Sequence, residues 1–343
     1  MNGRRIGRGT GGRWGGVLGL WLAGWASGAQ PFQFPTANHA LVEAGGDAAF
    51  LAPTPGHTWE SGSFGCVRVD RGGSRLHEGL DIKSLVHDGR GEPTDPVLSS
   101  AAGTVAYLNR HPGASNYGNY ALVRHYVERM EVYTLYAHLS SVLPQLAAGT
   151  KVAAGDRLGT MGRTGQPIGK ERAHVHFEIN LILNDRFDAW FRKHYPDERN
   201  DHGNFHGRNL LGIDPRAVLL EQQARGAEFS LARFVASQPV MARVVVRNPR
   251  LRFAARYPQL VRPNPRAERE GVAGYELGLN YNGIPVEMIP RSASELGGGS
   301  SHRLRSVNES EWKAHPCGRL VVRRGQAWTL TGKGDELVDL IAF

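Results

Sequence analysis

Polar and apolar residues alternate over residues 172–181, a pattern typical of a half-buried β-strand. Successive side chains of an extended strand point to opposite faces. One face would carry His174, His176 and Glu178. The other would carry Val175, Phe177 and Ile179. The alternation predicts a strand with an apolar core face and a second face that presents two imidazoles to one cavity.

Short runs of β-branched, aromatic and apolar residues recur through the first two thirds of the chain, separated by glycine-containing turns. We expect extended segments over residues 61–69, 75–84, 96–108, 116–125, 131–140 and 157–161. The run over 96–108 is interpreted as two strands joined at Gly103. Helical spacing is found only at residues 185–195 and 213–223. The fold class that follows is mainly β, with small helices.

The character of the chain changes beyond Gly226. Alternating runs at 242–246, 275–281, 318–323 and 327–330, separated by Asn, Pro and Gly, predict a C-terminal β-rich accessory domain over 226–343. Its arginines from Arg243 through Arg269 could bind an anionic cell-wall polymer. No pattern of stacking aromatic residues accompanies them, so we expect no nucleic-acid partner.

Residues 1–29 have the pattern of a secretory signal peptide: a basic start, a short apolar stretch and a small-residue cleavage site before Gln30. An uncleaved membrane anchor is the alternative, but the apolar stretch is about half the ~20 residues of a spanning helix. No later segment is expected to cross a membrane. We therefore predict a periplasmic or extracellular protein. Loss of four arginines with this segment lowers the formal charge from +9 to +5.

Residues 30–56 are spaced by prolines and lack a sustained period, which predicts an extended leader on the protein surface. The leader could instead cover the active-site groove, with Asn38 or His39 near a metal. The chain has two cysteines, Cys66 and Cys317. In an oxidising compartment they could form a long-range disulfide, although sequence does not say whether they lie close enough.

Three weak motifs carry the candidate chemistry. His77 and Asp81 share a face if their segment is extended, with Gly79 between them where the backbone needs to bend or be approached closely. His138 lies at the C-terminal end of the strand expected over 131–140. The third motif is the HxH pair in the strand over 172–181. The HxH pair alone could equally be two surface histidines, and each of the other two motifs alone is more often coincidence than site. The three nevertheless occur in a specific order, with the glycine-rich segment 149–165 between the last two.

That order, with the surrounding text LHEGLDI, DPVLSSAAGTVAYL, YGNYALVRH, TLYAHLSSV, KVAAGDRLGTMGRTG and HVHFEI, resembles the LytM/lysostaphin-type zinc endopeptidases of peptidoglycan. The resemblance covers about residues 64–176, with a tail at Asp214 and Pro215. It implies a lysostaphin-like antiparallel β catalytic domain, placed here at 57–225. It also implies that zinc is bound by His77, Asp81 and His176, with His138 and His174 as the catalytic pair.

The chemistry agrees with this assignment, because a catalytic zinc takes three protein ligands and keeps a fourth position for water. The rival assignment places both His174 and His176 on the metal. The chain departs from the family pattern by an insertion over about 183–212, which could line the substrate groove. A second metal site from His194, His202 and His206 is conceivable there, but a solvated loop is the better interpretation.

The resemblance implies an exported zinc metalloendopeptidase that hydrolyses peptide bonds in peptidoglycan stems or cross-bridges. All five positions are filled, which favours an active enzyme. The alternatives are a non-catalytic wall-binding protein or amidase activator with the same fold, and a metallopeptidase that acts on proteins.

Overall fold

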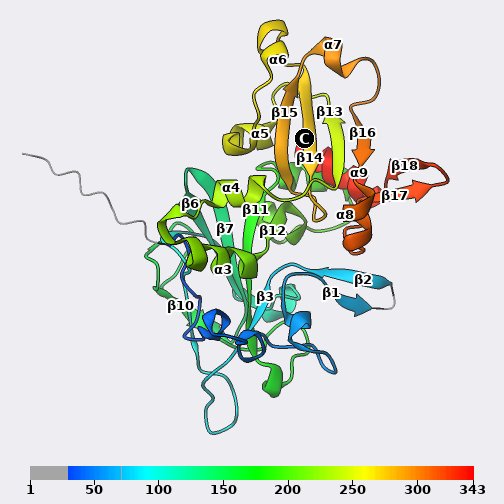
Figure 1. Cartoon of the computed structure of the whole chain (residues 1–343). Helices are drawn as coiled ribbons and strands as arrows, with labels where there is room; N and C mark the ends of the chain where they lie inside the picture. Colours follow the sequence, from blue (N-terminus) through cyan, green and yellow to red (C-terminus); the bar gives the residue numbers. More distant parts are fainter. Residues whose placement is uncertain (1–29, 71) are drawn as a thin grey trace, which may run out of the picture.

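The computed structural model describes residues 30–70 and 72–343, so the expected signal peptide at 1–29 lies outside the described residues. The two ends of the described chain belong to different parts of the molecule, as the colours of Figure 1 show. In the part of the chain that the structure describes, no helix combines the length and the apolar character that crossing a bilayer requires.

The centre of the molecule is a seven-stranded antiparallel sheet (Figure 1). Six strands follow one path in the order β12 (Leu210–Ile213), β11 (His174–Ile182), β7 (Met130–Leu139), β6 (Asn119–Val127), β5 (Gly103–Asn109) and β9 (Lys151–Val152). Strand β3 (Leu80–Lys83) pairs with the first half of β11. The expected strand with the HxH pair is therefore β11, and it lies between β3 and β7.

The two faces of β11 differ as the alternation predicts. Val175, Phe177 and Ile179 are fully buried in the main hydrophobic cluster. A smaller cluster lies on the sheet around Tyr120 and Leu135. Gly79 is needed because the backbone passes so close to β11 that a Cβ there would lie 2.3 Å from the carbonyl oxygen of Phe177.

Two smaller sheets flank the large one. Strands β4 (Pro96–Leu98), β10 (Arg157–Thr160) and β8 (Ser141–Val142) pair in that order. Strands β1 (Gly65–Asp70) and β2 (Gly73–His77) form a two-stranded ribbon that ends at His77. The ribbon starts later than the expected segment 61–69, because Trp59–Gly62 forms the 3-10 helix η2.

The leader packs onto the core. Its short helices are η1 (Ala40–Val42) and α1 (Asp47–Phe50), and Phe32, Phe50 and Leu51 are fully buried. Asn38 bonds to backbone carbonyls of Ala49 and Lys83, and His39 stacks on Phe34. Neither Asn38 nor His39 lines the cavity over the histidines of β11, so neither is placed to bind a metal there.

The remaining helices before Gly226 are short. They are η3 (Pro112–Ala114), η4 (Lys170–Arg172), α2 (Phe187–His194), η5 (Gly203–Phe205), η6 (Gly207–Asn209) and α3 (Pro215–Arg225). The expected helix at 213–223 begins two residues later, because the side chain of Asp214 caps its N-terminus by accepting from the backbone N–H of Ala217 at 3.1 Å.

The C-terminal part contains a four-stranded antiparallel sheet and a two-stranded ribbon. The sheet order is β15 (Pro285–Arg291), β14 (Gly274–Leu279), β13 (Ala242–Val246) and β16 (His302–Val307), and the ribbon pairs β17 (Val321–Arg324) with β18 (Ala327–Leu330). Helices are more numerous than the alternating runs predict: η7 (Gly226–Glu228), α4 (Leu231–Ala236), α5 (Arg252–Arg256), η8 (Pro258–Leu260), α6 (Pro265–Glu270), α7 (Ala293–Leu296), α8 (Glu309–Ala314) and α9 (Gly332–Ala342).

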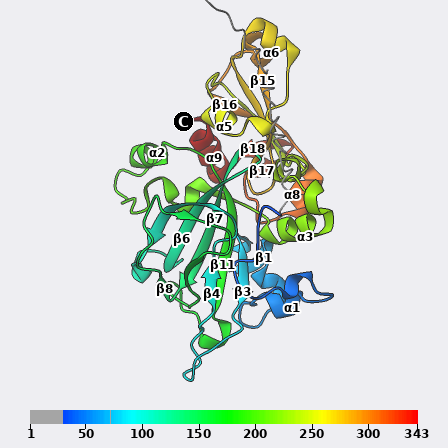
Figure 2. The same cartoon turned by 90° about the vertical axis from the view of Figure 1, so that its left-hand side faces the viewer.

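The C-terminal part packs against the central sheet (Figure 2), and the two share the main hydrophobic cluster. The hydroxyl of Tyr257 accepts from the backbone N–H of Ile182 at 3.0 Å, and Asn282 donates to the carbonyl of Gly212 at 2.7 Å. Cys66 and Cys317 form a disulfide that joins β1 to this part. The contact is therefore both covalent and apolar.

Several arginines of the C-terminal part already have acidic partners. Arg243 pairs with Glu287 at 2.8 Å, and Arg252 pairs with Asp185 at 2.5 Å. Arg266 pairs with Glu270 at 2.7 Å. Binding of an anionic polymer through the region from Arg243 to Arg269 therefore stays a prediction, and it would compete with these ion pairs.

Candidate metal centre

Strand pairing brings the separate motifs to one point. On β11, His176 lies directly opposite Asp81 of β3 on one side and Ala137 of β7 on the other. Directly opposed side chains of an antiparallel pair stand about 5 Å apart, close enough to share a ligand. His77 ends β2 and His138 follows Ala137 near the end of β7. All five candidate residues therefore meet, although 99 residues separate His77 from His176.

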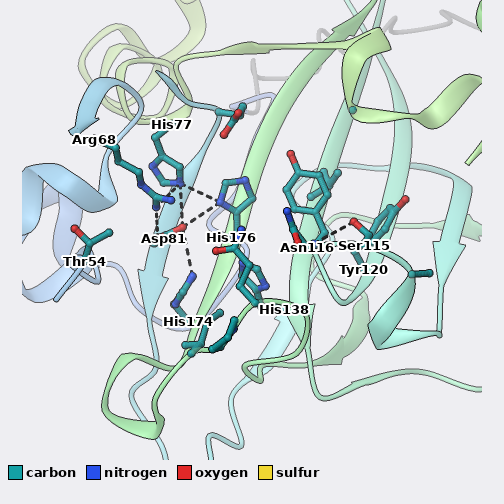
Figure 3. A pocket seen from close by; sticks show the side chains of 18 of the residues that line it. Thr54, Arg68, His77, Asp81, Ser115, Asn116, Tyr120, His138, His174 and His176 are labelled. Carbon is teal, nitrogen blue, oxygen red and sulfur yellow. Dashed lines mark hydrogen bonds and ion pairs between the residues drawn. The ribbon is translucent and has the colours of Figure 1, made fainter. Parts of the chain in front are cut away.

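His77, Asp81 and His176 point toward one another (Figure 3). Oδ1 of Asp81 lies 3.1 Å from Nε2 of His77 and 3.0 Å from Nδ1 of His176, and the two nitrogen atoms are 3.1 Å apart. All three side chains are buried. Within residues 30–70 and 72–343, they form the one group of at least three His, Cys, Asp or Glu side chains whose possible ligand atoms all lie within 4.8 Å of one another.

The hydrogen bonds behind the two imidazoles decide which nitrogen faces this point. Nδ1 of His77 lies 2.6 Å from the carbonyl oxygen of Ser63, and Nε2 of His176 lies 2.8 Å from Oε1 of Glu178. Carbonyl and carboxylate oxygens accept hydrogen bonds, so these ring nitrogens carry the protons. The lone pairs of the opposite nitrogens then meet the oxygen of Asp81. Three acceptors facing one another fit a cation, and two imidazoles with one carboxylate suit zinc.

The charges around His176 also favour a cation. Burial alone would lower the pKa of His176, but the carboxylates of Asp81 and Glu178 raise it to about 10. Burial likewise opposes ionisation of Asp81, yet the neighbouring His174 and His77 hold its pKa well below the ordinary value. Without a metal, a proton is the cation that this site attracts.

Glu178 is the residue that orients His176. Its Oε1 also accepts from the hydroxyl of Tyr117 at 2.6 Å, and its Oε2 accepts from the side-chain amide of Asn180 at 2.7 Å. The side chain is 2% exposed. A carboxylate that accepts from the far nitrogen of a metal-binding histidine fixes the ring and makes it a stronger ligand.

His138 and His174 lie beside the three-residue group. Their ring centroids are 5.0 Å apart, and that of His138 is 5.9 Å from that of His176. Nδ1 of His138 donates to the carbonyl of Thr164 at 2.8 Å, and Nδ1 of His174 donates to that of Arg172 at 2.6 Å. Both neutral rings therefore hold their lone pair on Nε2.

Both histidines are kept neutral. Burial is the main cause that lowers the pKa of His138 to about 3, and the nearby imidazoles of His174 and His176 lower it further. Burial also lowers the pKa of His174. His138 has a positive φ of 61°, a conformation that non-glycine residues adopt mainly where the surroundings impose it. A neutral imidazole can accept a proton from water and then donate it to a leaving group.

A cavity of about 450 Å³ opens over these five residues. Its lining includes Thr54, Arg68, Arg75, Arg172, Ser115, Asn116, Tyr117 and Tyr120. Arg75 pairs with Arg68 across the β1–β2 ribbon, Arg172 approaches Asp81, and Tyr117 packs on Tyr120. Figure 3 shows Arg68 and Thr54 on one side of the histidines and Ser115, Asn116 and Tyr120 on the other. The cavity therefore has one cationic wall and one neutral, partly aromatic wall.

The insertion over 183–212 lines this cavity, as the sequence suggested. It supplies His202, Phe205, His206 and Gly207. Nδ1 of His202 lies 3.1 Å from the hydroxyl of Tyr107 and 3.0 Å from that of Tyr120. His194 instead pairs with Asp339 at 3.1 Å. The insertion thus forms part of the cavity lining. Among the described residues, His194, His202 and His206 do not form a metal-binding group.

Residues 75–188 match Peptidase family M23. This M23 segment contains all five candidate residues, and the resemblance to LytM/lysostaphin-type peptidases is confirmed. Peptidoglycan DD-endopeptidase ShyA of Vibrio cholerae is 38% identical over 84 residues, which cover 24% of this chain and 17% of that protein. Peptidoglycan DD-endopeptidase ShyB of the same organism is 36% identical over 95 residues, covering 27% and 19%. The matches thus span less than a fifth of each curated relative.

Two solved structures are similar to the chain. A zinc-containing peptidase from Vibrio cholerae is 26% identical, covers 38% of this chain and 35% of its own, and has a TM-score of 0.28. The catalytic domain of lysostaphin from Staphylococcus simulans is 24% identical, covers 34% and 75%, and has a TM-score of 0.26.

Arg68 and Arg172 are site residues that the sequence motifs missed. Arg68 lies before the M23 segment, and its guanidinium donates to Oδ2 of Asp81 at 2.6 Å and to Nε2 of His77 at 2.9 Å. Arg172 lies two residues before His174, in η4. The one signal in the sequence for Arg172 was its position two residues before His174, because the long side chain of an arginine there can reach the residues around the HxH pair.

Proposed function

We propose that this chain is an exported zinc metalloendopeptidase that hydrolyses peptide bonds in peptidoglycan stems or cross-bridges. One observation carries the proposal: three buried acceptor atoms, from His77, Asp81 and His176, face one point with two neutral histidines beside it. Export is supported by the basic, apolar and small-residue pattern of residues 1–29. Peptidoglycan as substrate is supported by the activity printed in the names of ShyA and ShyB.

His77, Asp81 and His176 would hold the metal. When bound, zinc supplies Lewis-acid activation of water and of the scissile carbonyl. Glu178 keeps the proton of His176 on Nε2, so that Nδ1 remains a ligand atom. Arg68 donates to the other oxygen of Asp81 and thereby restricts rotation of that carboxylate.

His138 and His174 would move the proton. Each holds its lone pair on Nε2, because the carbonyls of Thr164 and Arg172 keep the other nitrogen protonated. One accepts the proton of the attacking water and delivers it to the leaving amine, while the other stabilises charge on the carbonyl oxygen. Burial keeps both rings neutral at the start of the cycle.

The test is product analysis of purified sacculi digested with the zinc-loaded protein beginning at Gln30. We expect new peptide ends in stems or cross-bridges, absent from digests with His138→Ala or His176→Ala. Intact sacculi with a fully zinc-loaded, folded protein would overturn the proposal. Stimulation of a separate amidase under those conditions would indicate the activator alternative, and cleavage of polypeptides alone would indicate a protein-directed peptidase.

A further inference from the structure

Two guanidinium groups converge on one carboxylate at the edge of the metal centre. Arg68 donates to Oδ2 of Asp81 at 2.6 Å, whereas the nearest terminal nitrogen of Arg172 is 3.8 Å from the same oxygen. The second distance is too long for a hydrogen bond. Asp81 therefore forms its hydrogen-bonded ion pair with Arg68. Its carboxylate compensates the charge of Arg172 only in part.

Arg172 is held in place from behind. Its Nε donates to the carbonyl oxygen of Pro53 in the leader. In the described part of the chain, neither of its terminal amino groups has a hydrogen-bonding partner, and its side chain is 18% exposed where it lines the cavity. Burial and the nearby Arg68 both act against its charge, which lowers its pKa. A fixed, partly buried cation whose terminal donors are open to the cavity is suited to an anionic ligand.

The lining of the cavity is cationic near Asp81. Arg68, Arg75 and Arg172 line the cavity, and Arg68 lies across the histidines from Ser115, Asn116 and Tyr120 (Figure 3). Glu78 is the one carboxylate that lines the cavity outside the metal centre. The three arginines therefore give the cavity lining an excess of positive charge there. A divalent metal at Asp81 would increase the positive potential further.

The distances restrict where the anion sits on a substrate. Oδ1 of Asp81 faces the metal position, and Arg172 approaches Oδ2 of the same carboxylate. One residue spans about 3.8 Å, and a charged hydrogen bond adds about 2.8 Å. A carboxylate bound by Arg172 would thus belong to a residue next to the scissile bond.

We propose that Arg172, with Arg68 beside it, binds a free carboxylate on the carbon that bears the scissile amide nitrogen. This inference rests on the proposed peptidase function and names its substrate class. The acyl-side α-carbon of a peptide cannot carry a free α-carboxylate, because that carboxyl group forms the scissile amide. The amine side can carry one, either at a C-terminal residue or at a diamino acid in a cross-link.

The reaction remains an ordinary hydrolysis. The oxygen of water bonds to the scissile carbonyl carbon, the C–N bond breaks, and the proton reaches the leaving nitrogen through His138 or His174. The carboxylate on Arg172 takes no part in the bond changes. Arg172 is therefore a specificity-determining residue, and it should act mainly on substrate binding.

The test compares two synthetic peptides that differ only in a carboxylate or a carboxamide next to the scissile bond. With the zinc-loaded protein we expect kcat/KM to be about tenfold or more higher for the acid, which corresponds to about 1.4 kcal/mol. Arg172→Gln should bring this ratio close to one, mainly through KM, with zinc content unchanged. Arg90→Gln, which removes an exposed arginine outside the cavity, should keep the ratio.

Binding measured without turnover separates this inference from the proposed function. In the zinc-loaded His138→Ala protein, calorimetry should show at least tenfold tighter binding of the acid than of the amide, and Arg172→Gln added to it should remove the difference. Equal binding of both peptides, or discrimination that survives Arg172→Gln, overturns the inference. Loss of all hydrolysis with discrimination intact would refute only the peptidase. Parallel assays with a C-terminal peptide and a cross-linked diamino acid peptide identify the source of the carboxylate.

Discussion

Nε2 of His176 lies 2.8 Å from Oε1 of Glu178, two positions further along the same strand. The i, i+2 spacing places both side chains on one face of β11, so the strand supplies a ligand and its orienting carboxylate together. Tyr117 and Asn180 hold the carboxylate in turn.

Glu178→Gln should weaken zinc binding about 10- to 100-fold, the usual effect of losing such an orienting carboxylate. The amide keeps the size of the side chain but lacks its charge, so His176 becomes a poorer ligand. Competition with a chromophoric chelator measures the affinity. Glu171→Gln, at an exposed position in η4, is the control and should leave the affinity unchanged. Equal affinities for wild type and Glu178→Gln would contradict the assigned role.

His176→Ala should abolish zinc-dependent stabilisation. A ligand that binds only the folded state adds about 2.7 kcal/mol at one hundred times its dissociation constant. Wild-type protein stripped with a chelator should therefore gain thermal stability when zinc is restored, and His176→Ala should gain none. Thermal melts with and without zinc make the comparison. Restoration of the full gain in the variant would show that His176 is not a ligand.

The neutral state of His138 should appear as a pH dependence of folding. Burial and the neighbouring His174 and His176 lower its pKa to about 3, whereas an unfolded histidine titrates near about 6.5. Between these values the unfolded chain binds a proton that the folded chain does not. Stability contributed by His138 is thus present above about pH 6.5 and declines as the pH falls toward 3, by up to about 1.4 kcal/mol per pH unit.

Urea unfolding of metal-free protein from pH 7 to pH 4 checks this expectation. His138→Gln should show a shallower loss of unfolding free energy on acidification than wild type. His57→Gln, at an exposed position, should follow the wild-type curve. Superimposable pH dependences for wild type and His138→Gln would show that His138 is accessible to protons in the folded state.

Replacing both cysteines, Cys66→Ser with Cys317→Ser, should destabilise the contact between β1 and the C-terminal part. The bond joins residues separated by 251 positions, and chain-entropy estimates for loops of this length are about 5 kcal/mol. Limited proteolysis should then cut preferentially in the β1–β2 ribbon. Val69→Ser, an exposed residue of the same ribbon, is the control. An unchanged cleavage pattern and melting temperature would contradict a structural role for the disulfide.

The sequence was most informative where chemistry and periodicity coincide. Alternation alone placed His174, His176 and Glu178 on one face of β11, and the order of motifs indicated the M23 segment. Gly79 was expected at a bend or a close approach, and the structure shows a close approach to the carbonyl oxygen of Phe177. The alternation in β11 depends on local geometry, which one strand determines by itself.

Features that depend on distant partners were missed. No residue of strand β16 is fully buried, and only Leu304 and Val307 of its six residues are apolar, so its place beside β13 depends on pairing more than on burial. Helix α9 begins in a glycine-containing stretch, yet Val338, Leu340 and Ile341 are buried against other elements. Arg68 and Arg172 acquire their roles only because β1 and η4 fold toward Asp81.

The covalent link between β1 and the C-terminal part imposes an order on how the molecule is completed. Cys66 lies two residues before Arg68, and its partner is made 251 residues later. Arg319 also holds the ribbon, by donating to the carbonyl of Ser74 at 2.9 Å. A nascent chain interrupted before this point can have every strand of the central sheet and still lack the anchor of its cationic wall.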